Sequence, residues 1–206
     1  MTNMYKKCRL CRREKQKLFL KGDRCFSPKC PIEKVGPVAP GMHGLKSGFR
    51  LSEYGSQLRE KQKTKRYYGI MEKQLKNYLD KAGVISGDQG ENLLRLLEFR
   101  LDNVVCRLGL ASSRRMARQL ITHGKILVNG GKVKIPSYNL QPKDKVALSE
   151  SGAKIKSVEV WLIKKDLEVP GWLKRKGTSG TVEKEPTREE MPQDIKESLI
   201  IEFYSR

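Results

Sequence analysis

Four cysteines near the start of the chain constrain its fold more than any other feature of the sequence. Cys8 and Cys11 are separated by two residues and Cys25 and Cys30 by four, so two close pairs are joined by a loop. A close pair lets one turn of backbone direct two thiolates at one ion, and two such pairs complete a closed tetrahedral site. We therefore expect residues 1–45 to form a basic segment that is folded around one metal centre.

The spacing leaves the identity of that centre open. A structural Zn²⁺ ion is the favoured cofactor, because close cysteine pairs are typical of structural zinc sites. An iron–sulfur cluster also takes four cysteines, and two disulfides are a further alternative if the compartment is oxidising. Four thiolates leave no position for a substrate, so the expected role is structural. Cys106 lies in a helical pattern far from the others and is expected in the core.

Positive charge is abundant and unevenly spread. The 206 residues include 43 lysines and arginines against 23 acidic residues, a formal net charge of +20. Residues 1–50 hold 13 of these cations and 3 acids, whereas residues 181–206 hold 4 cations and 7 acids. Such an excess repels itself unless a polyanion offsets it, so nucleic acid is the expected partner. We expect a cytoplasmic protein with no membrane partner, because neither a bilayer-spanning apolar run nor a signal region is apparent.

Two regions after the cysteine segment have the apolar periodicity of helices. Residues 52–83 are expected to be helical with Ser52 as a possible N-cap, and residues 91–110 as one further helix that stops at Gly109. A run of cations precedes the apolar stripe of the first region. Beside the basic N-terminal segment, this run favours phosphate contacts by its members, which are Arg59, Lys61, Lys63, Lys65 and Arg66.

Residues 112–148 predict a short helix followed by a hairpin. Ser112 or Ser113 can cap the helix, which ends at Gly124, and its arginines fall within an arc of about 100°. Apolar triplets flank Asn-Gly-Gly at 129–131, which is a strong hairpin signal, and a further strand is expected at 146–148. Beyond it, residues 155–163 alternate like a strand and residues 168–180 resemble a turn-rich connector. The cations of this unit are Arg114, Arg115, Arg118, Lys125 and Lys132.

Taken together, these motifs resemble the bacterial small-subunit ribosomal protein four family. The resemblance rests on CRLCRRE with the two later cysteines, PGMHG, SEYGSQLREKQK, YYGIMEKQL, LLRLLEFRLDNVVCRLGLASSRRMARQLITHGKILVNG, IPSYNL, VPGWL and LIIEFYSR. It covers essentially the whole chain. The part from ASSRRMARQL to ILVNG alone is similar to a small RNA-binding domain that also occurs in pseudouridine synthases and a tRNA synthetase.

The resemblance implies an α+β fold with an N-terminal four-cysteine metal segment and a mainly helical domain. A small RNA-binding domain, built of two helices packed on an antiparallel sheet, is inserted into the helical one. The implied boundaries are 1–45 for the metal segment, 46–95 for the first helical part, 96–160 for the RNA-binding domain and 161–206 for a C-terminal segment that returns to the helical domain.

The family implies a structural ribosomal protein and not an enzyme. Its members bind 16S rRNA directly, nucleate assembly of the 30S body, contribute to translational accuracy, contact small-subunit protein five and lie near the mRNA entrance. The cysteines place the chain with the metal-bearing subgroup, with Cys8, Cys11, Cys25 and Cys30 as ligands. Matching the family's motifs to this sequence implies RNA contact by the arginines of the short helix and by Lys125. The full set of candidate RNA-binding residues is Arg9, Arg12, Arg13, Lys46, Arg59, Lys61, Lys63, Lys65, Arg66, Arg114, Arg115, Arg118, Lys125 and Lys132.

Two other classes of protein use similar parts. An RNA-modifying enzyme can carry the same RNA-binding module, but little chain is left here for a catalytic domain, and His43 and His123 are the only histidines. A DNA-binding zinc protein would place a recognition helix after the cysteine pairs, which this sequence does not indicate. We therefore expect recognition of folded RNA through its shape and phosphates.

Overall fold

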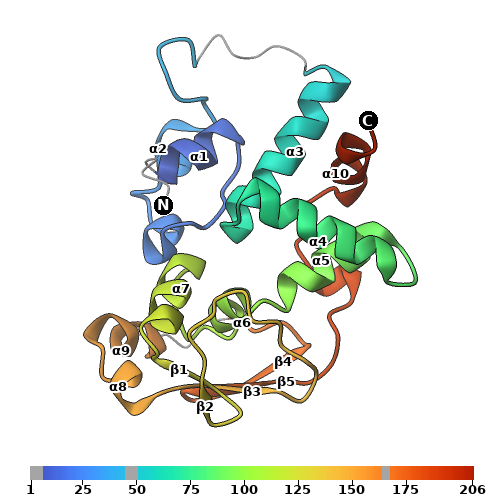
Figure 1. Ribbon diagram of the computed structural model, residues 1–206. Coiled ribbons are helices and arrows are strands. Elements are labelled where there is room, and N and C mark those ends of the chain that lie inside the picture. The colour runs from blue at the N-terminus through green and yellow to red at the C-terminus, as the bar shows by residue number, and fades with distance from the viewer. Residues whose placement is uncertain (1–6, 45–50, 164–167) are drawn as a thin grey trace. The chain divides into compact units, whose positions relative to one another are not determined.

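The computed structural model describes residues 7–44, 51–163 and 168–206 (Figure 1). The chain divides into two compact units, of which the first comprises Met1–Leu75 with Ile195–Arg206 and the second comprises Lys76–Asp194. The units divide the chain at 75/76 and 194/195, whereas the resemblance implied boundaries after residues 45, 95 and 160, which stay predictions. Within the described ranges, no helix has the length and apolar character needed to cross a membrane.

The first unit is helical. Its elements are α1 (Lys7–Arg13), η1 (Gly22–Phe26), α2 (Pro31–Val35), α3 (Glu53–Tyr68), the start of α4 (Glu72–Val84) and α10 (Glu197–Tyr204). Ser52 caps α3 as expected, since its hydroxyl accepts a hydrogen bond from the backbone N–H of Gly55 at 3.1 Å.

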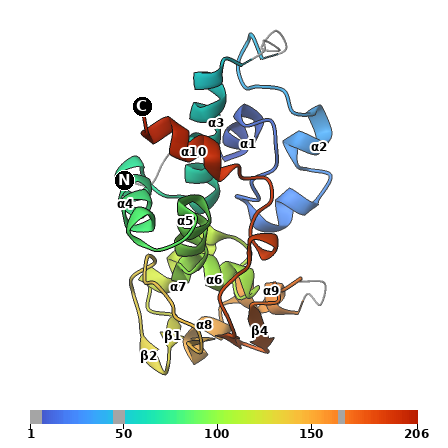
Figure 2. The same ribbon diagram turned by 90° about the vertical axis from the view of Figure 1, so that its right-hand side faces the viewer.

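The C-terminal helix α10 packs along α3, and both views show the two helices side by side (Figures 1 and 2). Ile200 of α10 and Ile195 just before it are both buried. The backbone N–H of Lys196 donates to Glu60 Oε1 at 2.8 Å, and Gln57 Nε2 donates to Glu202 Oε2 at 3.0 Å. The apolar end of the chain is thus a helix that completes the first unit.

The second unit combines helices with an antiparallel sheet. The sheet has the order β2-β1-β3-β5-β4, and Ile126 and Val128 of β1 pair with Leu148 and Val146 of β3. The α+β class and the packing of helices on an antiparallel sheet are therefore confirmed. The elements in chain order are α5 (Gln89–Glu98), α6 (Leu101–Arg107), α7 (Arg114–Thr122), β1 (Ile126–Val128), β2 (Gly131–Lys132), β3 (Lys145–Leu148), α8 (Glu150–Ala153), α9 (Lys156–Leu162), β4 (Leu173–Lys176), β5 (Ser179–Val182) and η2 (Arg188–Glu190).

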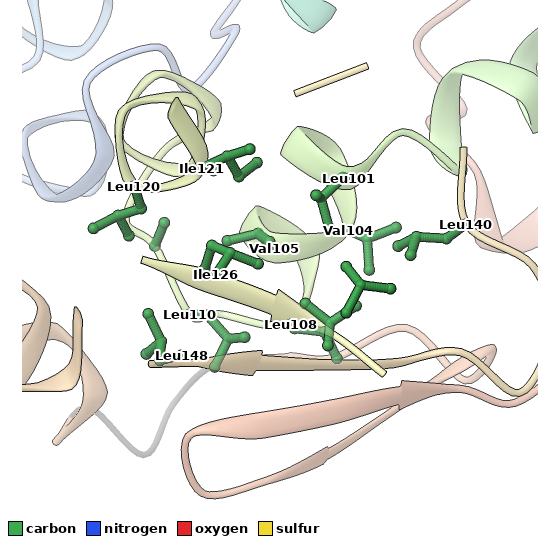
Figure 3. Packing of buried hydrophobic residues seen from close by; sticks show 14 of the residues in the cluster. Leu101, Val104, Val105, Leu108, Leu110, Leu120, Ile121, Ile126, Leu140 and Leu148 are labelled. Carbon is green, nitrogen blue, oxygen red and sulfur yellow. The ribbon is translucent and has the colours of Figure 1, made fainter. Parts of the chain in front are cut away.

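Helices α6 and α7 supply one side of the core and the strands supply the other (Figure 3). Val105 of α6 and Ile121 of α7 lie over Ile126 of β1, and all three are fully buried. The approach of α6 to the sheet depends on Gly180 of β5, because a Cβ atom there would lie 2.4 Å from Leu108 Cδ2. This packing fixes the positions of α6 and α7.

The expectation of one helix over residues 91–110 is wrong. The structure has α5 and α6 with a break at Phe99 and Arg100, where Arg100 is extended. The backbone N–H groups of Leu101 and Asp102 donate to the carbonyls of Tyr138 and Pro136 at 2.9 and 3.1 Å. The loop that contains Pro136 and Tyr138 therefore accepts hydrogen bonds from the first N–H groups of α6. The periodicity of the leucines does not indicate this contact.

Two expectations for the region after β3 are also wrong. Residues expected to form a strand make helix α9, in which Val158 and Trp161 are buried at helical spacing while Val160 is exposed. The region expected to be a turn-rich connector contains β4 and the start of β5, and Leu173 of β4 pairs with Val182 of β5. The alternation of valines favours a strand over residues 155–163, and the lysine-rich composition of residues 168–180 does not indicate a strand pair.

Candidate RNA interface and cysteine cluster

Two of the three candidate arginines on α7 are bonded to polar residues of α6. Arg114 donates from Nε to Asn103 Oδ1 at 2.7 Å. Arg118 donates to Asp102 Oδ2 from Nε at 3.2 Å and from Nη2 at 2.5 Å, while its side chain stays 38% exposed. Arg115 is exposed beside them. The helix therefore presents cations to solvent, two of which are held in place from inside the protein.

The carboxylate of Asp102 is buried, with only 1% of its side chain exposed. Arg100 donates to its two oxygens from Nε at 3.0 Å and from Nη2 at 2.9 Å, and from Nη1 to the hydroxyl of Tyr78 at 2.8 Å. Burial by itself would lower the pKa of Arg100, but the hydrogen bond and charge of Asp102 raise that pKa above its ordinary value. One buried anion thus binds an internal guanidinium and also the surface guanidinium of Arg118.

A second buried acid supports Arg114 through an amide. Glu98 is fully buried and accepts from Nε and Nη2 of Arg107 at 3.1 and 3.0 Å. It also accepts from Asn103 Nδ2 at 2.8 Å, and this bond directs the amide oxygen of Asn103 toward Arg114. Sequence reasoning did not find these supporting residues. The run EFRLDN could have indicated them, because it places polar side chains among leucines and valines of the core.

The hairpin lysines lie close to α7 in the chain. Lys125 directly precedes β1 and donates from Nζ to Ser151 Oγ at 3.1 Å, while Lys132 is exposed on β2. The turn between the strands is fixed by Asn129, which has a φ of 50° and donates to Asp144 Oδ1 at 2.8 Å. The hairpin expected at 129–131 is confirmed, and RNA contact by the two lysines stays a prediction.

The cations of α3 face acidic partners within the first unit. Lys61 and Lys65 donate to Glu72 at 2.8 and 2.7 Å, and the hydroxyl of Tyr204 in α10 donates to the same carboxylate at 2.5 Å. Burial would raise the pKa of Glu72, but these hydrogen bonds outweigh it and lower the pKa to about 2. The Nζ atom of Lys61 also lies 3.9 Å from the ring centroid of Phe203.

The other three cations of this run are paired in the same way. Lys63 binds Glu60 at 2.6 Å, and Arg59 and Arg66 both bind the buried carboxylate of Glu14. All five side chains of the run are buried or half-buried. The structure therefore gives this run an internal role, and its proposed contact with phosphates stays a prediction.

The N-terminal arginines differ in their surroundings. Arg12 donates from Nε to the carbonyl of Val38 at 2.8 Å and from Nη2 to that of Ala39 at 3.1 Å, so it braces the cysteine segment. Arg9 and Arg13 are exposed on α1. Lys46 lies outside the described residues.

The four cysteines come from three neighbouring places in the first unit. Cys8 and Cys11 belong to α1, Cys25 belongs to η1, and Cys30 directly precedes α2; the last three are buried. The pKa of Cys11 is raised above its ordinary value. Burial is the largest cause, and the charges of the other three cysteines nearby raise the pKa further. A backbone hydrogen bond from Leu18 acts in the opposite direction.

The donor set suits a soft metal, but its geometry is not that of a formed centre. The backbone N–H of Lys21 donates to Cys25 Sγ at 3.3 Å, a contact that favours negative charge on sulfur. Among the side chains in the described ranges, no group of three or more cysteine, histidine or acidic residues is placed to hold an ion. The structure gathers the four cysteines into one small segment, but no three of them are arranged as ligands of one ion. Cys106 lies apart on α6 and packs against the core of the second unit.

Two family models match successive parts of the chain. The model described as the ribosomal protein S4/S9 N-terminal domain matches residues 2–98, and the one described as the S4 domain matches residues 99–146. The junction falls at the end of α5, where the structure breaks the expected long helix.

Similar proteins extend over nearly the whole chain. The small ribosomal subunit protein uS4 of Dictyoglomus thermophilum is 53% identical over 97% of this chain and 96% of its own length. The proteins uS4 of Thermodesulfovibrio yellowstonii and uS4A of Alkaliphilus metalliredigens are 50% and 52% identical over the same shares. With both domain models matched in order and half of all residues identical to such relatives, the chain belongs to the small ribosomal subunit protein uS4 family.

Proposed function

We propose that this protein is a structural component of the small ribosomal subunit in the cytoplasm that binds 16S rRNA directly. The observation that carries the proposal is the arginine face of α7, where Arg114 and Arg118 are held by Asn103 and Asp102. Side chains that are already ordered lose less conformational entropy when they bind, so such a face suits phosphate contact. The family consists of ribosomal proteins and not of enzymes, which decides against the RNA-modifying alternative.

The finer parts of the proposal rest on the family. They are nucleation of the 30S body, a contribution to translational accuracy, contact with small-subunit protein five and a position near the mRNA entrance. The N-terminal segment is basic and the C-terminal region is acidic, which supports binding of RNA by the N-terminal segment.

Charge reversal at Arg115 tests direct phosphate contact, because Arg115 is exposed and its replacement disturbs little of the fold. For Arg115→Glu we expect weaker binding to a 16S rRNA transcript. The slope of log affinity against log salt should fall in magnitude by about 0.7 to 0.9 for each phosphate that the variant no longer binds. Lys184→Glu is the matched control, because it makes the same change of charge in the acidic C-terminal region. An unchanged slope in Arg115→Glu would contradict the assignment.

We also propose that Cys8, Cys11, Cys25 and Cys30 bind one metal centre, which places the chain in the metal-bearing subgroup. Support comes from their gathering in one segment, from the burial of three of them and from the amide directed at Cys25 Sγ. The centre is a structural Zn²⁺ ion, and an iron–sulfur cluster is the alternative. When bound through its thiolate ligands, the metal would hold α1, η1 and the start of α2 together.

Elemental analysis of protein purified without oxygen or chelator tests this proposal. We expect one zinc per chain, whereas about four irons would indicate a cluster. The Cys25→Ser variant should lose the metal, and Cys106→Ser should keep it, because Cys106 lies in the second unit. Absence of both metals from the unaltered protein would refute a metal centre.

A further inference from the structure

Two phenylalanines of the cysteine segment stack on each other at the surface. The ring centroids of Phe19 and Phe26 lie 5.1 Å apart with an interplanar angle of 29°. Phe26 is 70% exposed and Phe19 is 39% exposed. Single exposed apolar residues are ordinary, but a stacked pair of rings this open to water forms a continuous apolar surface that the described parts of the chain leave uncovered.

The backbone holds this pair in place at some cost. Phe19 has a φ of 50°, in the left-handed region that an aromatic residue rarely adopts. Its neighbour Leu18 is buried, and Phe26 directly follows the buried Cys25. The two residues that precede the rings are thus anchored inside the segment, and the strained turn at Phe19 directs its ring to the surface beside Phe26. Strain of this kind persists where the surroundings determine the conformation, and it is frequent at ligand sites.

The charge around the rings indicates an anionic partner. Three exposed cations, Lys21, Arg24 and Lys29, lie within three residues of one ring or the other, against one exposed acid, Asp23. An apolar ring surface beside cations matches the two parts of a nucleotide, since an aromatic ring stacks on the base and cations bind the phosphate.

We propose that Phe19 and Phe26 form a platform on which an unpaired base of ribosomal RNA stacks, with the neighbouring cations on its phosphates. This inference rests on the proposed function, because it assumes that the chain binds 16S rRNA. It adds a site in the first unit to the arginine face of the second. The recognised element is a single-stranded nucleotide and not a helix, because bases inside a duplex cannot present a free face.

Substitutions at Phe26 separate stacking from other contacts. Phe26→Ala in the full chain should weaken binding to a 16S rRNA transcript about 5- to 150-fold, the effect of one stacked base. The salt dependence should keep its slope, because every phosphate contact remains. Phe26→Leu should bind the transcript nearly as weakly as Phe26→Ala, because leucine keeps apolar bulk but has no π-face. Phe26→Tyr should bind the transcript like the unaltered protein. Val35→Ala is the matched control, because Val35 is also an exposed apolar residue of this segment.

A spectroscopic variant reports on stacking directly. The two native tryptophans, Trp161 and Trp172, are buried in the second unit, so Phe26→Trp adds an exposed fluorophore at the platform. Its emission should be quenched when the transcript binds. Wild-type affinity of Phe26→Leu, or an unquenched Phe26→Trp that binds normally, would overturn the proposal.

The outcomes also separate this inference from the proposed function. Failure of the unaltered protein to bind the transcript would refute the proposed function itself. Normal binding by Phe26→Ala, together with a defect only when other small-subunit proteins are present, would overturn the platform and assign the rings to a protein partner.

Discussion

Replacing Asp102 by asparagine tests how much this buried carboxylate contributes to the stability of the fold. Asp102 is buried and accepts two hydrogen bonds from Arg100, at 3.0 and 2.9 Å, and two from Arg118, at 3.2 and 2.5 Å. Asparagine has nearly the same shape, but it removes the charge and turns an amide N–H₂ toward guanidinium donors. Arg100 would then be a buried cation without its counterion.

The expected loss of stability is about 3 to 5 kcal/mol, the cost of removing one partner from a buried ion pair. The assay is urea unfolding followed by tryptophan fluorescence, because Trp161 and Trp172 are both buried in the second unit. Asp80→Asn is the matched control: Asp80 is exposed on α4, and its replacement should change the free energy of unfolding by less than about 0.5 kcal/mol. A loss below about 1 kcal/mol for Asp102→Asn would refute the assignment of a buried, charged pair.

A double variant tests whether Asp102 also positions Arg118 for RNA. Replacing Arg100 by methionine together with Asp102 by leucine removes both buried charges, a change that is often neutral for stability. Arg118 keeps its own charge but loses its anchor. We expect near-native unfolding with reduced affinity for 16S rRNA. Native affinity in a stable double variant would show that Asp102 serves the fold alone.

Two further predictions concern the contacts of α10 and of the sheet. Because the folded pKa of Glu72 is lowered to about 2, its ion pairs stabilise the first unit above the ordinary glutamate pKa and lose that effect as pH falls toward 2. Glu72→Gln should cost about 1 kcal/mol at neutral pH, a value reduced for screening because the side chain is 46% exposed, and circular dichroism melts should show this difference vanish near pH 2. Gly180→Ala should destabilise the second unit by about 1 to 3 kcal/mol in urea unfolding, because its Cβ would meet Leu108, whereas Gly131→Ala should be nearly neutral.

Local features of the fold could be predicted from the sequence because local chemistry decides them. Ser52 and Ser113 cap their helices through hydrogen bonds to residues three positions on. Asn129 and Gly130 adopt the positive φ angles of 50° and 84° that a two-residue hairpin turn requires. The arc of arginines on α7 likewise follows from helical geometry alone.

Features that depend on distant partners could not be predicted. The break before α6 is determined by carbonyls of Pro136 and Tyr138, which no periodicity near residue 100 reveals. In the site, sequence reasoning identified the arginines of α7 and missed Asp102 and Glu98, which hold the network beneath them. An acid inside an apolar stripe is a visible signal, but its arginine partners are known only once the chain is folded.

Burial of some acids beside arginines keeps negative charge off a surface that already has an excess of cations. Glu14, Glu98 and Asp102 have almost no exposed side-chain area, and each is bound by arginines that lie nearer to solvent. Each acid fixes guanidinium groups while its own charge is kept away from an approaching phosphate. The cost of burying these carboxylates is offset only while their arginines remain, so replacing Arg118 itself should weaken the fold as well as the proposed phosphate contact. Loss of RNA affinity at Arg115, which is exposed, is therefore the cleaner measure of phosphate contact.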